Sequence, residues 1–150
     1  MALRRVVRQY GAGRMGQVIG SARGVATEAK LEELGIVLPE QVNPKGNYIS
    51  FVRAGNLGYL SGHLPVPANG DIIKGRLGDD FDVEQGYAAA RACGLQLIAT
   101  MKSNLGDLDK VKRTVRVGGF VQCTPDFSQQ ANVLNGCSDL FGEVFGERGV

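Results

Sequence analysis

Residues 82–106 read DVEQGYAAARACGLQLIATMKSNLG, which is the clearest signal of secondary structure in the chain. Its apolar residues recur at helical spacing, which predicts a helix from Asp82 to Leu105. Asp82 is suited to cap the start of this helix, and Gly106 is suited to a left-handed stop at its end. The apolar stripe consists of Val83, Tyr87, Ala90, Leu95, Ile98 and Met101. A long helix with such a stripe is expected to lie on a sheet.

A second helix is predicted near the end of the chain. It begins at Asp126 or Ser128 and runs to about Val144. Its apolar side contains Val133, Leu134, Cys137, Leu140, Phe141 and Val144. The predicted helix from Asp82 to Leu105 contains two glycines, Gly86 and Gly94. They weaken its helix propensity and indicate close contact with a neighbouring backbone. The two helices are expected to share one face of the sheet.

The sheet is predicted from short runs that are rich in β-branched and aromatic residues. Residues 48–53 and 57–61 are two such runs, and Ala54-Gly55-Asn56 between them indicates a hairpin. Residues 71–74 are a candidate for a short third strand. Residues 111–121 form a β-branched run with alternating side chains, which predicts a further strand.

A short helix is predicted ahead of the hairpin, from Thr27 to Gly35, with Thr27 as its N-cap and Gly35 as its C-terminal stop. Strands followed by helix, strand and helix predict an α+β fold, in which an antiparallel or mixed sheet carries two helices on one face. The order stops after the last helix. We therefore expect a sheet of few strands with an uncovered edge.

The first 27 residues differ in composition from the rest of the chain. They are rich in Arg, Ala and Gly, contain no acidic residue and have no apolar run of secretory or transmembrane length, which is typical of a transit peptide. We expect residues 1–27 to be a mitochondrial (matrix) targeting segment; a basic leader without a targeting role is the alternative. Five of the 17 basic residues and none of the 15 acidic ones lie in this segment, so acidic residues outnumber basic ones in the domain that follows, residues 28–150. This balance does not indicate general nucleic-acid binding.

The residues that bind metals and cofactors are few. Cys93, Cys123 and Cys137 are odd in number and lack CxxC spacing, so neither a disulfide framework nor a zinc site is expected. His63 is the only histidine, which argues against a histidine-rich metal site. Residues 11–16 contain a GxGxxG pattern, but they follow an arginine-rich stretch rather than an apolar strand, so a dinucleotide site is not expected there. We expect no metal and no cofactor.

Several ordered blocks resemble one family. They are Gly46-Asn47-Tyr48, residues 55–65 (GNLGYLSGHLP), residues 107–115 (DLDKVKRTV) and residues 120–127 (FVQCTPDF). From about Leu31 onward the chain resembles the RidA/YjgF family of enamine/imine deaminase-like proteins, also called L-PSP proteins. The resemblance implies a chorismate-mutase-like α+β subunit and a homotrimer whose clefts lie between neighbouring subunits.

Relatives in this family hydrolyse reactive enamines or imines made by pyridoxal-phosphate enzymes, such as 2-aminoacrylate, to a 2-oxo acid and ammonia. By resemblance, Tyr48 lines the substrate cleft, Ser61 offers a hydroxyl to the substrate, and Gly62 leaves room for it. His63 replaces the usual glutamine, and Cys123 is a neighbour of the cleft. Structural roles are the alternative: Tyr48 as a half-buried strand aromatic, Ser61 in a turn, and His63 as a cap on a backbone group.

The family pattern continues beyond the motif FGERG, residues 145–149, whereas this sequence ends at Val150. Active relatives carry after that motif an arginine that clamps the substrate carboxylate, and then a final strand pair. Arg148 precedes the family position, so the clamp is not assigned to it. We expect a domain that is incomplete at its C-terminus. Three explanations are open: the chain is a fragment, a partner supplies the missing strands, or the domain is a non-enzymatic subunit of a larger mitochondrial assembly. Ribonuclease activity gains no support from a single histidine.

Overall fold

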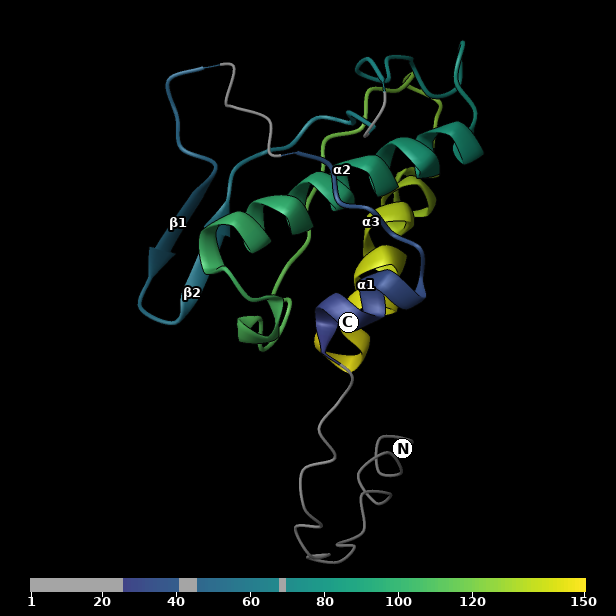
Figure 1. Ribbon diagram of the computed structural model, residues 1–150. Helices are drawn as coiled ribbons and strands as arrows, with labels where there is room; N and C mark the ends of the chain where they lie inside the picture. The colour runs from purple at the N-terminus through teal and green to yellow at the C-terminus, as the bar shows by residue number, and fades with distance from the viewer. Residues whose placement is uncertain (1–25, 41–45, 68–69) are drawn as a thin grey trace, which may run out of the picture.

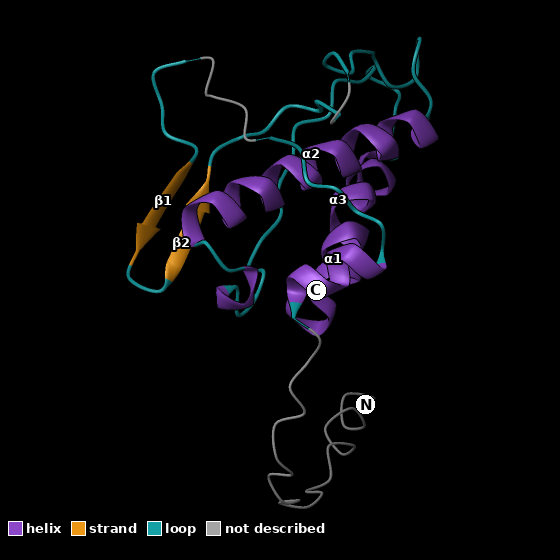
Figure 2. Cartoon of the chain, viewed as in Figure 1, coloured by secondary structure: helices purple, strands orange, loops and turns teal. Residues whose placement is uncertain are grey.

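The computed structural model describes residues 26–40, 46–67 and 70–150 (Figure 1). The elements are α1 (Thr27–Glu33), β1 (Phe51–Ala54), β2 (Leu57–Leu60), α2 (Val83–Leu105), η1 (Leu108–Lys110), α3 (Gln130–Phe145) and η2 (Gly146–Arg148), where η denotes a 3-10 turn (Figure 2). The predicted α+β class is confirmed. The proposed targeting segment and the GxGxxG pattern lie outside the described residues, except for the last two residues of the segment.

Helix α2 forms as the sequence predicts. The Asp82 side chain accepts a hydrogen bond from the Gln85 backbone N–H at 2.8 Å, and the Gln85 side chain accepts one from the Asp82 N–H at 2.9 Å. This reciprocal capping box satisfies donors that a helix start leaves unpaired. Gly106 follows α2 with φ of 76°, a left-handed backbone angle that favours glycine. None of the described helices is both long and apolar enough to cross a bilayer.

Helices α2 and α3 pack against each other and carry most of the core. Ile98 of α2 and Leu140 of α3 are both 0% exposed. Close packing at the glycines of α2 is confirmed, although the nearest neighbours are side chains: a Cβ at Gly94 would lie 2.9 Å from Leu140 Cδ2, and one at Gly86 would lie 2.9 Å from Leu77 Cδ1. Small residues therefore let the two helices approach closely along their length.

The predicted hairpin is confirmed, with shorter strands. β1 and β2 are antiparallel, and the register places Phe51 opposite Leu60 and Val52 opposite Tyr59. The turn contains Gly55 at φ of 60°. β1 begins at Phe51 rather than Tyr48, because the register of paired residues starts at Phe51 and Leu60, and before it the Ser61 N–H donates to the Ser50 carbonyl outside the strand. The hairpin lies beside the C-terminal part of α2 (Figure 1).

Two predicted strands are wrong. In the described part of the chain the only sheet is the β1–β2 pair, and residues 71–74 and 111–121 belong to neither strand. Alternation and β-branching predict an extended backbone, but a strand also needs a partner at hydrogen-bonding distance. The chain after residue 121 finds only an isolated bridge: the Leu77 N–H donates to the Gln122 carbonyl and the Leu77 carbonyl accepts from the Thr124 N–H.

Two predicted helix starts are also wrong. Thr27 is the first residue of α1 rather than its N-cap, which is Ala26, and the Thr27 side chain is directed into the protein and 0% exposed. α3 begins at Gln130, because a turn at Thr124, in which the Phe127 N–H donates to the Thr124 carbonyl, occupies the residues before it.

Candidate functional site

The residues that the sequence assigns to a substrate cleft gather where the hairpin opens. Tyr48 precedes β1 and is 50% exposed. Ser61 follows β2, where its N–H donates to the Ser50 carbonyl at 3.0 Å and its hydroxyl donates to the Ile49 carbonyl at 2.5 Å. A Cβ at Gly62 would meet no atom within 4 Å, so space is open at that position. An exposed phenol, a serine and an open glycine thus lie at one end of the hairpin.

His63 connects this region to α2. Its Nδ1 lies 2.8 Å from the Ser61 carbonyl oxygen and its Nε2 lies 2.8 Å from Thr100 Oγ1. A carbonyl oxygen can only accept, so Nδ1 carries the hydrogen, and in the neutral ring the Thr100 hydroxyl donates to Nε2. Thr100 is 1% exposed. His63 therefore caps a backbone group and fastens the end of β2 to the helix, which is the structural role that the sequence left as an alternative.

Cys123 lies apart from the other predicted site residues within one chain. It is half-buried beside the apolar group of Leu77, Ala90 and Val133, and its Sγ lies 3.7 Å from Gln130 Nε2. Ala90 precedes Thr100 by ten residues of α2, which is about 15 Å of helix. The fold thus brings Tyr48, Ser61, Gly62 and His63 to one end of α2 and Cys123 toward the other.

The other two thiols are chemically quiet. Burial raises the pKa of the Cys93 thiol to about 11 and that of the Cys137 thiol to about 11. Both side chains therefore remain protonated near neutral pH, and the thiol is a poor nucleophile compared with the thiolate. Their role is packing between α2 and α3.

A polar network near the C-terminus was not predicted. Arg148 donates from one terminal nitrogen to the Val111 carbonyl at 3.0 Å and from the other to Thr27 Oγ1 at 2.8 Å. The Thr27 hydroxyl in turn donates to Asp109 Oδ1, and the Arg148 guanidinium lies 3.6 Å from the same oxygen. Arg148 thereby joins α1, η1 and the chain end. The only signal in the sequence is the FGERG motif itself, which does not reveal its distant partners.

Three carboxylates beside this network, from Glu28, Asp107 and Asp109, place oxygen atoms within 4.8 Å of one another, a spacing that a metal ion can bridge. Hydrogen bonds account for their positions. The Leu108 N–H donates to Glu28 Oε1 at 3.2 Å, and the Asp109 N–H donates to Asp107 Oδ1 at 2.8 Å. The cluster therefore serves to cap η1 and α1.

Acid is expected to weaken this network through Asp109. Hydrogen bonds from the Thr27 hydroxyl and N–H hold the pKa of Asp109 below its ordinary value of 3.8. Asp109 therefore binds a proton more readily in the unfolded chain than in the folded one. Its contribution to stability is present above the pKa of Asp109 in the unfolded chain and is lost as the pH falls through the pKa of Asp109 in the folded protein. We expect urea unfolding at pH 6 and near pH 3 to show a smaller acid-induced loss of stability in Asp109→Asn than in the wild type. Equal losses in the two proteins would contradict this role.

The comparisons with known proteins agree with one another. Residues 28–150 match the family model described as "YjgF/chorismate mutase-like, putative endoribonuclease". The chain is 45% identical over 130 residues to Protein TCP17 of Trypanosoma cruzi, an alignment that covers 87% of this chain and 79% of TCP17. Among solved structures, it is similar to a "putative endoribonuclease" from Shewanella oneidensis MR-1 (TM-score 0.80, 33% identity, 84% of this chain and 83% of that chain). It is also similar to Atu1372, a protein of unknown function from Agrobacterium tumefaciens (TM-score 0.73, 39% identity, 83% and 77%).

Proposed function

The chain belongs to the YjgF/chorismate mutase-like family, and from this premise we propose that it hydrolyses small 2-imino acids, such as the imine form of 2-aminoacrylate, to 2-oxo acids and ammonia. The observation that carries the proposal is family membership across residues 28–150, together with the open end of the hairpin at Tyr48 and Ser61.

The reaction needs little from the protein. The enamine first takes a proton at carbon and becomes the imine, whose C=N carbon is electrophilic. Water adds to that carbon and gives a carbinolamine; the C–N bond then breaks, nitrogen leaves as ammonia, and the remaining oxygen forms the ketone of the 2-oxo acid. A site that orients the substrate, places the water and stabilises the developing charge is sufficient.

The hairpin offers groups suited to that task. The Ser61 hydroxyl can both donate and accept a hydrogen bond. If it gives up its hydrogen bond to the Ile49 carbonyl, it can donate to the substrate or to the attacking water instead. Tyr48 presents an exposed phenol one residue before Ile49, and Gly62 is exposed with no atom near the position of a Cβ. His63 is occupied on both ring nitrogens, so we assign it a positioning role rather than proton transfer.

We propose that the site is completed in a homotrimer. The outer face of the hairpin is apolar and uncovered, with Val52 at 44%, Leu57 at 47% and Tyr59 at 57% exposure, and Phe120 is fully exposed. Adjacent apolar side chains of this size are typical of a protein interface. A neighbouring copy would cover them, and the family resemblance implies that residues of that copy complete the cleft. Sedimentation equilibrium tests the assembly.

The compartment is proposed from composition. The basic, acid-free first 27 residues support import into the mitochondrial matrix, where an inside-negative potential draws such a segment inward. Fractionation of cells that express the full chain, compared with a chain lacking residues 2–25, tests this: matrix recovery of the first protein alone is the expected result.

A non-enzymatic role is the second candidate. The same exposed apolar face, at Val52, Leu57 and Tyr59, also suits a subunit that only contacts other proteins in a mitochondrial complex. Stable co-purification with a larger complex, combined with no turnover by the folded protein, would favour this function over hydrolysis.

The deciding experiment measures ammonia release from freshly generated 2-aminoacrylate. We expect the wild type to exceed the spontaneous rate and Ser61→Ala to lower kcat/KM about tenfold, because a hydrogen bond to the reacting groups is lost. Ser103→Ala, which removes an exposed hydroxyl from the same polypeptide, is the matched control and should behave as wild type. Circular dichroism and oligomeric mass, checked in all three proteins, separate loss of chemistry from loss of the hairpin.

A further inference from the structure

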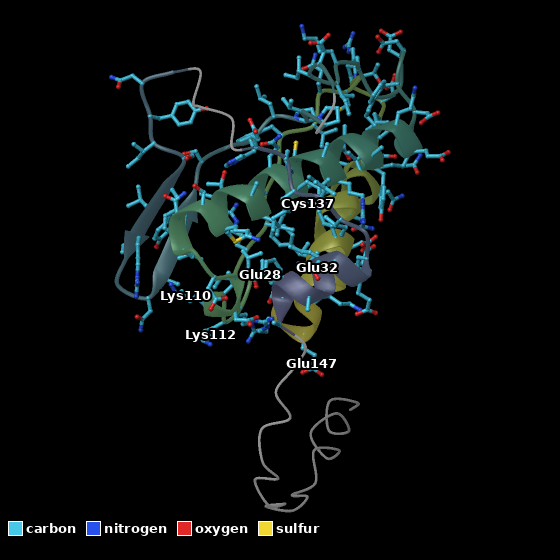
Figure 3. All side chains as sticks on the ribbon, in the orientation of Figure 1. Glu28, Glu32, Lys110, Lys112, Cys137 and Glu147 are labelled. Carbon is cyan, nitrogen blue, oxygen red and sulfur yellow. The ribbon has the colours of Figure 1, made fainter. Side chains whose placement is uncertain are left out.

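A hollow of about 380 Å³ lies between α1, the chain that follows it and the last turns of α2. It is lined by Glu28, Leu31, Glu32, Ile36, Leu38 and Lys102. Figure 3 shows Glu28 and Glu32 on the α1 segment. Lys102 follows Thr100 by two residues on α2, so their side chains point to nearly opposite sides of the helix, about 160° apart. The hollow is therefore separate from the hairpin region that His63 and Thr100 join.

The floor of the hollow is aliphatic. Leu31 is 4% exposed, and Ile36 and Leu38 are half-buried against the same core. Gly35, at φ of 64°, reverses the chain after α1, and the Ile36 N–H donates to the Leu31 carbonyl at 2.8 Å. After this turn the chain leaves α1 and runs toward α2 (Figure 1). The floor thus suits a branched aliphatic group of a few carbons.

The walls carry charges of both signs. Glu28 and Glu32 supply carboxylates from consecutive turns of α1, and Lys102 supplies an ammonium from α2. No ion pair within 4.0 Å joins Lys102 to either glutamate across the described residues. The opposite charges therefore line one space without a direct ion pair between them. A ligand with only a positive or only a negative charge would meet repulsion from one wall.

We propose that this hollow binds an L-α-amino acid with an aliphatic side chain, such as leucine, in its zwitterionic form. The ligand's ammonium group contacts Glu32 and the Glu28 oxygen that does not accept from the Leu108 N–H, its carboxylate contacts Lys102, and its side chain covers Leu31, Ile36 and Leu38. Each charged group of the ligand then meets an opposite charge at the edge of an apolar surface, where water screens the pair less than in the open. The proposal is independent of the hydrolytic activity proposed above.

The test is calorimetric titration of the full-length protein with L-leucine. We expect saturable binding, of roughly millimolar affinity because the contacts are few. Lys102→Met and Glu32→Gln should each weaken binding about fivefold or more, because each removes one charged partner. Lys112, labelled in Figure 3, is exposed and is not among the residues that line the hollow, so Lys112→Met should bind leucine like the wild type.

Two analogues complete the test. Isoamylamine keeps the aliphatic chain and the ammonium, and 4-methylpentanoate keeps the chain and the carboxylate. Both are expected to bind at least about fivefold more weakly than leucine. The proposal is overturned if leucine shows no saturable binding to the folded wild type, or if Lys102→Met and Glu32→Gln bind leucine unchanged. Isoamylamine binding as tightly as leucine would overturn it in favour of a purely cationic partner.

Discussion

Replacing Gly136 by alanine is expected to lower the free energy of unfolding by about 3 kcal/mol, because overpacking at a close helix crossing forces backbones apart. A Cβ at Gly136 of α3 would lie 2.0 Å from the Tyr87 carbonyl oxygen of α2 and 3.1 Å from the Arg91 nitrogen. Both neighbours belong to a helix backbone, so no side-chain rotation can relieve the clash. The helices must separate, and the contacts around the fully buried Leu140 must loosen with them. Urea unfolding at a fixed protein concentration measures the effect.

Gly142→Ala provides the matched control on the same helix. A Cβ there would approach no atom closer than Val150 Cγ1 at 3.5 Å, an ordinary contact. Alanine favours a helix interior over glycine by about 1 kcal/mol, so this variant should be at least as stable as the wild type. Similar stabilities for Gly136→Ala and Gly142→Ala would show that α2 and α3 do not cross at this distance.

Replacing Arg148 by alanine is expected to lower the free energy of unfolding by about 2 kcal/mol. The variant loses hydrogen bonds from a charged donor and the packing of the aliphatic part of the side chain. Its guanidinium holds the Val111 carbonyl and the hydroxyl of Thr27, and Thr27 is 0% exposed. The Thr114 N–H also donates to the Arg148 carbonyl, so the segment from residue 111 to 114 is attached to this residue twice. The Arg148 side chain remains about one-third exposed, so water screens its ion pair with Asp109 and limits the electrostatic contribution to stability.

Arg148→Lys separates charge from geometry. Lysine keeps the positive charge but lacks the planar fork that reaches two acceptors at once, so most of the loss should remain. Hydrogen exchange is expected to rise first at α1 and in residues 111–114, because those are the parts that Arg148 connects. Wild-type stability in Arg148→Lys would mean that a charge near Asp109 is sufficient.

Arg148 and His63 show which features of the candidate site the sequence does not predict. The blocks that resemble the family select Tyr48 and Ser61, and the structure places both at one end of the hairpin. The partner of His63 is Thr100, 37 residues away, and no local pattern marks that pair. Arg148 reaches Thr27 across 121 residues in the same way. Hydrogen bonds of this span depend on how helices and loops meet, so only the fold reveals them.

Local sequence is sufficient to predict the elements whose causes are local. The capping box at Asp82, the stop at Gly106 and the turn at Gly55 each depend on residues a few positions apart, so α2 and the hairpin are where the sequence predicts them. Which segments pair and which side chains become buried depends on the folded chain as a whole. Residues 111–121 have the alternation of a strand, but no strand within residues 26–40, 46–67 and 70–150 lies alongside them. Thr27 looks like a helix cap but is buried against Asp109 and Arg148. Pairing and burial depend on distant parts of the chain, which no short stretch of sequence can specify.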